Sequence, residues 1–463
     1  MRNFKLHINK IMRIRSLPVL LVAALAACSS VLDVPPTNQI PADVAIANAV
    51  GARAALTGAY SGLQASGLYG HELLDWTELL SDNSTWVGTF DDWADADFNS
   101  LRADNTTLEQ VWDNAYDEIN RVNNIIQKVP AVTDLSDAEK NEILGEAYFL
   151  RALVYHDLVR LWGGVPLRTE PVASAEEAGN ITRASVAETY AQIHADLGQA
   201  EQLMSAEASD TRRASLGAAR ALDARVRLYE KDWAGAEAAA ATVESMGYDL
   251  APNFSDLFDA TGNSTPEDIF RVTFTSTQSN GLGVYYLPKV LGGRYEVAPT
   301  QGPGGSLDAF DPASGGDSAN YNPTDARGVW SVRVDSKTWA SKFRNPSGDE
   351  DVHVIRLAEV ILIRAEALAH LNRLPEAVAE YNRLRVRAGV APDPVVGLTQ
   401  AGVLDAIARE RRLELAFEGD RWPDLVRTGQ AITLLGLTAQ QTLLPIPQND
   451  IDTAPGITQN PGY

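Results

Sequence analysis

Apolar residues recur at helical spacing through much of the chain. The clearest segments are 108–128, 143–161 and 185–204, where hydrophobic side chains return every three or four residues between polar ones. The third segment opens with Ser185 and Glu188, the two residues of a capping box at a helix N-terminus. The pattern therefore predicts a mainly α-helical protein.

Two later segments, 219–246 and 357–387, each predict a pair of helices joined by a short turn. Ala224 and Ala236 flank the first turn at a spacing of twelve, and Ala365 and Ala377 repeat that spacing around the second. Small residues at such positions let paired helices approach closely, as in tetratricopeptide repeats. We therefore predict repeat-like helix pairs, with an ordinary alanine-rich bundle as the alternative.

The stretch 248–350 has a different composition. It is rich in Gly, Pro, Asn, Asp and Ser, and its strand-like runs at 269–275 and 332–335 are short. Within it, 302–325 predicts a long irregular loop. Loop-rich insertions on a rigid frame often carry binding sites, so we expect the ligand site here.

The N-terminus has the pattern of an exported lipoprotein. Basic residues precede an apolar run at 17–27 that is too short to span a bilayer, and Cys28 follows Leu25-Ala26-Ala27 directly. This arrangement predicts a cleaved signal peptide and a lipid anchor on Cys28 rather than a buried cysteine. Cys28 is the only cysteine, so no internal disulfide can form.

These patterns divide the chain into four functional parts. We predict a signal peptide at 1–27, a proline-bearing tether at 28–42, a helical scaffold at 43–247 and 351–463, and the ligand-binding insertion at 248–350. Loss of the five basic residues before Cys28 changes the formal net charge from −22 to −27. Such a charge argues against nucleic acid and anionic lipid headgroups as partners.

The common catalytic and cofactor motifs are missing from the sequence. It contains no Gly-x-Ser-x-Gly, no Walker loop, no His-Glu-x-x-His and no cysteine pair, so we predict no catalytic residue, cofactor or metal. The start of a calcium loop at 95–99 has Ser100 and Thr106 where glycine and glutamate are needed. A glycosidase carboxylate pair stays open, because 61 acidic residues always offer candidates.

Aromatic residues in loop-like segments are the better candidates for a binding site. Flat rings stack on sugar rings or apolar side chains, while nearby polar groups set the orientation of a ligand. The candidates are Trp86 and Trp93, in a segment that also holds Phe90 and lacks a clear helical stripe, and Tyr285, Tyr286, Tyr295, Trp330 and Trp339 in the insertion. For each ring the alternative role is core packing. The helix-associated residues Trp112, Trp162, Trp233 and Trp422, and the histidines His156 and His353, are assigned to structure.

A dense cluster of both charge signs occupies 410–429, with the sequence ERRLELAFEGDRWPDLVRTG. The charges predict a buried ion-pair network that closes a helical domain. Trp422 and Pro423 are expected to stop the helix that carries the cluster.

Several blocks together resemble the SusD/RagB family of surface lipoproteins. In chain order they are LDVPPT, VWDNAYDEINRVNNII, GEAYFLRALVYHDLVRLWGGVPL, VIRLAEVILIRAEALAHLNRLPEAVAEYNRLRVRAG, the 410–429 block, LLPIPQNDI and QNPGY. The resemblance covers essentially the whole chain after Cys28.

The resemblance implies an α-rich SusD-like fold with four repeat-like helix pairs and an irregular ligand-binding part. It also implies a function without catalysis: capture of a nutrient oligomer and its delivery to a SusC-like TonB-dependent barrel. The protein would be anchored through Cys28 to the outer membrane and face the exterior. A glycan is the usual ligand class in the family, whereas some relatives handle peptides. A repeat-type adaptor that only stabilises a membrane complex is a further alternative.

Overall fold

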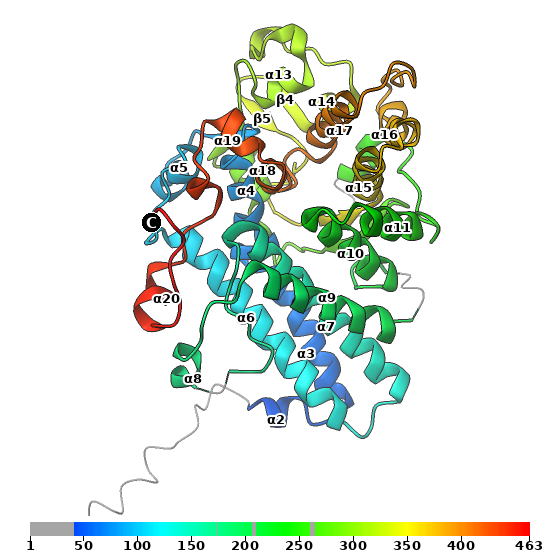
Figure 1. Ribbon diagram of the computed structural model, residues 1–463. Coiled ribbons are helices and arrows are strands. Elements are labelled where there is room, and N and C mark those ends of the chain that lie inside the picture. Colours follow the sequence, from blue (N-terminus) through cyan, green and yellow to red (C-terminus); the bar gives the residue numbers. More distant parts are fainter. Residues whose placement is uncertain (1–40, 173, 206–209, 260–263) are drawn as a thin grey trace, which may run out of the picture.

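The computed structural model describes residues 41–172, 174–205, 210–259 and 264–463, and most of them are helical (Figure 1). The predicted signal peptide, Cys28 and nearly all of the tether lie outside these residues. Within the described ranges, no helix combines the length and the apolar character needed to cross a membrane.

Long helices from the first half of the chain pack side by side in one layer (Figure 1). The layer contains α3 (Ala49–Leu63), α6 (Thr106–Lys128), α7 (Asp137–Trp162) and α9 (Val186–Leu203), with the short α2 (Ala42–Ala45) and α8 (Ala175–Gly179) at its edge. The predicted capping box is confirmed, because the Ser185 hydroxyl accepts from the Glu188 N–H and the Glu188 carboxylate accepts from the Ser185 N–H.

The two predicted helix pairs are confirmed. They are α10 (Leu216–Glu230) with α11 (Trp233–Glu244), and α15 (Leu357–His370) with α16 (Leu374–Arg387). The four alanines of the spacing pattern are fully buried, which is what close helix approach requires. Because α11 also packs on α15, the two pairs form one stack.

Three small antiparallel sheets involve the 248–350 stretch, and two of them pair it with strands outside it. β1 (Ser84–Trp86) pairs with β3 (Val297–Pro299), β2 (Asp268–Val272) with β6 (Val352–Arg356), and β4 (Val332–Val334) with β5 (Thr338–Ala340). The strand-like runs are therefore confirmed in position. The prediction of an irregular loop at 302–325 is wrong in part, because α13 (Ser306–Phe310) and two 3₁₀ turns form there.

Further short helices occur where the sequence pattern was weakest. They are α4 (Glu72–Leu79), which follows the single π-helical turn η1 (Ser66–Gly70), α5 (Asp91–Asp97), α12 (Leu282–Tyr286) and α14 (Ala326–Ser331). The segment around Trp93 is thus a strand followed by a helix rather than an open loop.

The C-terminal region contains α17 (Gln400–Leu415), α18 (Arg421–Arg427), α19 (Gln430–Leu435) and α20 (Gln448–Thr453). The prediction that Trp422 and Pro423 stop a helix is wrong. The preceding helix ends at Leu415, and Phe417 and Gly419 then adopt positive φ angles of 65° and 80°. Pro423 lies in the first turn of α18, where a missing N–H breaks no helical hydrogen bond.

The last residues of the chain return to the C-terminal end of α7. The indole N–H of Trp162 donates to the carbonyl of Pro445 over 2.8 Å. The side chain of Asn460 donates to the carbonyls of Trp162 and Leu444 over 3.0 and 2.7 Å. The tail therefore satisfies buried polar groups of a helix almost 300 residues earlier in the chain.

Candidate functional site

An open cavity of about 630 Å³ lies where η1, α4, α5, α6 and α12 meet. Its lining includes His71, Glu72, Phe90, Trp93, Gln110 and Tyr285. We call this cavity the aromatic pocket. Of the seven aromatic residues predicted to bind ligand, Trp93 and Tyr285 line it.

The rings of the aromatic pocket contact one another at steep angles. The ring centroid of Tyr285 lies 4.7 Å from that of His71, 4.9 Å from Trp93 and 5.9 Å from Phe90. Trp93 is buried, whereas Phe90 and Tyr285 are only half-buried. These tilted and edge-to-face contacts fix the rings while leaving part of the aromatic surface open to a ligand.

Two long-range contacts hold the walls of the aromatic pocket together. The N–H of Gly281, just before α12, donates to the carbonyl of Gly70 over 2.7 Å. A Cβ atom on Gly281 would lie 2.5 Å from the His71 ring and 2.6 Å from the Tyr285 ring, so only glycine permits this approach. Opposite, the Arg294 guanidinium lies 4.4 Å from the Phe90 ring centroid, which fixes that ring by a cation–π contact.

Carboxyl groups lie beneath the rings. Glu72 lines the aromatic pocket and is buried, and burial raises the pKa of its carboxyl to about 7, with His71 opposing and Asp75 adding to that effect. Asp75 is fully buried one turn further along α4, and burial raises its pKa although His71 Nδ1 lies 3.4 Å from its Oδ2. One buried carboxyl therefore belongs to the lining of the aromatic pocket, and a second lies one turn behind it.

Two of the other predicted aromatic residues are core residues. Tyr286 is fully buried, and its ring centroid lies 6.1 Å from that of Phe417. Trp339 is buried in β5 and donates from its indole N–H to Asp335 over 3.3 Å. Neither ring offers an open face to a ligand, so the core alternative holds for both.

The remaining three are half-buried at other places. Trp86 packs against Phe98 with ring centroids 6.3 Å apart. Tyr295 donates to the carbonyl of Thr338 over 2.8 Å and lines a separate cavity of about 520 Å³. Trp330 has the Arg344 guanidinium 3.7 Å from its ring centroid, so that face is covered. The structure does not bring these three rings into the aromatic pocket.

His71, Glu72 and Gln110 were missed as site residues. His71 and Glu72 lie in an apolar, helix-like stretch that carries no sign of a site, and Gln110 lies on an ordinary amphipathic helix. Phe90 and Trp93 lie in the same short segment, and this cluster of aromatic residues was the sequence feature that pointed to the pocket.

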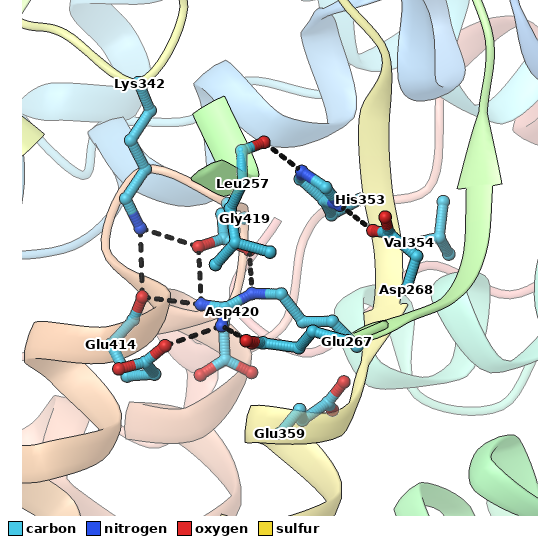
Figure 2. A network of polar contacts seen from close by, with 12 residues as sticks. Leu257, Glu267, Asp268, Lys342, His353, Val354, Glu359, Glu414, Gly419 and Asp420 are labelled. Atoms are coloured by element: carbon cyan, nitrogen blue, oxygen red, sulfur yellow. Dashed lines mark hydrogen bonds and ion pairs between the residues drawn. The ribbon is translucent and has the colours of Figure 1, made fainter. Parts of the chain in front are cut away.

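The predicted buried ion-pair network is confirmed (Figure 2). The Arg356 guanidinium donates to Glu267 and Glu414 over 2.7 and 2.6 Å, and its Nε donates to Glu418 over 2.9 Å. Lys342 also donates to Glu418 over 2.6 Å. All of these side chains are buried, so the two-sign cluster is structural.

The same C-terminal block anchors α4, the helix that carries Glu72. The carboxylate of Glu78 accepts from the Gly419 N–H over 2.9 Å. Just beyond α4, Asp82 accepts two hydrogen bonds from Arg421 over 2.7 and 2.8 Å. The most recognisable part of the sequence therefore positions one wall of the aromatic pocket without entering it.

Two family models match the chain. Residues 32–228 match a family described as starch-binding and associating with the outer membrane, and residues 313–436 match the SusD family. A SusD-like protein of Formosa agariphila is 29% identical over 499 residues, covering 96% of this chain and 97% of that protein. The starch-binding protein SusD of Bacteroides thetaiotaomicron is 25% identical over 419 residues, covering 71% of this chain and 74% of that one.

Solved structures match the fold over most of the chain. A SusD superfamily protein from Bacteroides vulgatus superposes with a TM-score of 0.79 at 23% identity, covering 89% of this chain and 99% of that one. A laminarin-binding SusD-like protein gives a TM-score of 0.73 at 26% identity, with 90% and 100% covered. This chain belongs to the SusD/RagB family, and its mainly α fold with few short strands is the fold of that family.

Proposed function

We propose that this protein is a non-catalytic glycan-binding protein of a nutrient-uptake system and that the glycan binds in the aromatic pocket. The observation that carries this proposal is the cavity of about 630 Å³ lined by Phe90, Trp93 and Tyr285. Sugar rings present C–H faces that stack on aromatic rings, while their hydroxyls need acceptors and donors such as Glu72 and Gln110.

Two relatives support the choice of ligand class. One is named as a starch-binding protein and a solved one as laminarin-binding, and both ligands are glucose polymers. None of the relatives named above is described as binding a peptide. Among the predicted ligand contacts, we retain Trp93 and Tyr285 and add Phe90, His71 and Glu72.

The proposed cellular setting follows from the family. We propose that lipid on Cys28 anchors the protein to the outer membrane, facing the exterior, and that the helical scaffold docks on a SusC-like TonB-dependent barrel that receives the glycan. The aromatic pocket draws its walls from both the scaffold and the 248–350 insertion. A change in the relative position of scaffold and insertion would therefore change the shape of the aromatic pocket.

Isothermal titration of the full mature protein tests the binding proposal. The titrants are maltoheptaose, laminariheptaose and a panel of peptides. We expect glycan binding that Tyr285→Ala weakens roughly tenfold or more, because one stacking face is lost. The matched control is Trp330→Ala, a half-buried ring outside the pocket, which should leave the affinity unchanged. Unchanged binding by the Tyr285 variant would refute the pocket assignment.

Two further measurements test the rest of the proposal. Pull-down of the lipidated protein from its native membrane in mild detergent should recover a stoichiometric TonB-dependent barrel. Recovery of the lipoprotein alone would contradict the docking proposal. Incubation with each bound glycan should release no shorter product, whereas product release abolished by one Asp or Glu substitution would overturn the non-catalytic assignment.

A further inference from the structure

The charged groups that line the aromatic pocket are acidic. Glu72, Asp91 and Asp92 line it, and none of its described lining residues is a lysine or arginine. Of the neighbouring cations, the Arg294 guanidinium lies 4.4 Å from the Phe90 ring centroid and 6.0 Å from that of Tyr285, and it pairs with Glu296 at 3.3 Å. The Arg102 guanidinium lies 3.1 Å from Asp104, 3.5 Å from Asp95 and 3.7 Å from Asp92. A ligand in the pocket therefore meets carboxylates first.

Glu72 is the most deeply placed of these acids. The residue is only 8% exposed, it lines the cavity, and its Oε2 has no hydrogen-bond partner among the described residues. A buried carboxylate oxygen without a donor costs free energy, and a ligand that brings a donor recovers that cost. A sugar hydroxyl or ammonium group supplies such a donor, whereas a carboxylate or sulfate supplies only acceptors.

Resting on the proposed glycan function, we propose that the aromatic pocket selects uncharged and amino-bearing glycans against uronate- and sulfate-bearing ones, with Glu72 as the specificity-determining residue. Two like charges about 7 Å apart in a partly desolvated site repel enough to lower affinity roughly tenfold. Asp91 and Asp92, on the facing α5, add to that repulsion. Arg294 and Arg102 are already paired with acids, so they offset this repulsion only in part.

The discrimination also depends on pH. The groups that face Glu72 are His71 and Asp75 from its own segment, Asp91 and Asp92 from α5, and Tyr285 from α12. Since burial raises the pKa of Glu72 to about 7, its charge appears as the pH rises through that value. Exclusion of acidic glycans should therefore be weaker at pH 5.5 than at pH 8.

The test uses ligands that differ only in charge. Maltoheptaose and laminariheptaose are each prepared unmodified, with one C6 hydroxyl oxidised to a carboxylate, and with one C6 hydroxyl replaced by an amine. We expect the carboxylated form of the binding backbone to bind roughly tenfold more weakly than the unmodified form at pH 8. Glu72→Gln should remove most of that gap and its pH dependence. The gap is the ratio of the two affinities measured in the same variant, because the unmodified glycan also loses its contact with the Glu72 carboxylate.

A matched control separates local from overall charge. Glu376→Gln removes the same charge at an exposed site on α16 that is distant from the pocket lining, and should preserve the gap. If Glu72→Gln fails to fold, as judged by circular dichroism, Asp91→Asn on the exposed side of α5 replaces it and should narrow the same gap.

The outcomes distinguish this inference from the function on which it rests. Equal or tighter binding of the carboxylated glycan, in a protein whose binding Tyr285→Ala weakens, overturns the charge selection alone. A gap that Glu72→Gln leaves unchanged overturns the role of Glu72. Absence of binding by every glycan, or binding that Tyr285→Ala does not affect, overturns the proposed function itself.

Discussion

Replacing Arg356 with methionine should destabilise the protein strongly. Arg356 is buried in the ion-pair network, where its guanidinium donates five hydrogen bonds. Methionine has a similar length but carries no charge and no donor. The substitution would leave Glu267, Glu414 and Glu418 with one cation fewer in a site where their side chains are buried.

The size of the effect follows from that desolvation. Removing one partner of a buried ion pair typically costs about 3–5 kcal/mol, because the remaining charge stays buried. Burial alone would raise the pKa of Glu414, but the guanidinium groups of Arg387, Arg356 and Arg327 hold it well below its usual range. A carboxyl whose pKa is lowered by folding stabilises the protein at pH values above its unfolded-state pKa. This stabilisation is lost as the pH falls through the folded-state pKa.

Urea unfolding followed by tryptophan fluorescence measures the effect. The free energy of unfolding of the Arg356 variant should be lower by about 3–5 kcal/mol at pH 7. The difference in unfolding free energy between the variant and the wild type should become smaller toward pH 5, because the glutamates that have lost Arg356 take up protons. The control is Arg53→Met, which breaks a pair with Glu139 whose arginine is 54% exposed and should cost less than about 1 kcal/mol. Equal losses for the two variants would refute the reasoning.

Three smaller predictions test other parts of the structure. Ser185→Ala should lower stability by about 1 kcal/mol and speed hydrogen exchange at the start of α9, because a capping box is lost; unchanged exchange would contradict this. Burial raises the pKa of both Glu72 and Glu78 to about 7. Their carboxyls therefore bind protons more tightly in the folded state than in the unfolded state. Their contribution to the free energy of unfolding falls as the pH rises from about 4.5 through 7. The urea midpoint of Glu72→Gln should accordingly fall less than that of the wild type between pH 5 and pH 8, and parallel curves would exclude this effect. Trp339→Ala should cost about 3–5 kcal/mol in urea unfolding yet leave glycan affinity unchanged, whereas lost affinity without lost stability would return this ring to the binding site.

The helical scaffold was predictable because its signals are local. The 3.6-residue periodicity of 108–128 and the twelve-residue spacing of Ala224 and Ala236 report contacts within one helix or one helix pair. The error at Trp422 and Pro423 has a physical cause. Proline is disfavoured in the interior of a helix but tolerated in its first turn. Sequence alone therefore does not say whether a proline ends one helix or begins the next.

The site was predictable only in part, because long-range pairing builds it. β1 pairs with β3 across more than 200 residues, and this pairing brings the segment before α5 beside the segment after α12. Tyr285 and Tyr286 illustrate the limit. They are neighbours in one five-residue helix, yet Tyr285 faces the aromatic pocket and Tyr286 the core. Both are tyrosines in the same helix, so only the residues that pack against each ring decide which one lines the pocket.

The return of the C-terminal tail to α7 constrains the order in which this chain can fold. The carbonyl of Trp162 and the carboxylates of Glu78 and Asp82 find their partners in residues 419–460. In a nascent chain that still lacks residues 419–460, these polar groups are open to water instead of being paired within the protein. The first half of the protein cannot reach its final state before the second half arrives. The C-terminal end of α7 and the end of α4 therefore reach their final packing only after residues 419–460 have been synthesised.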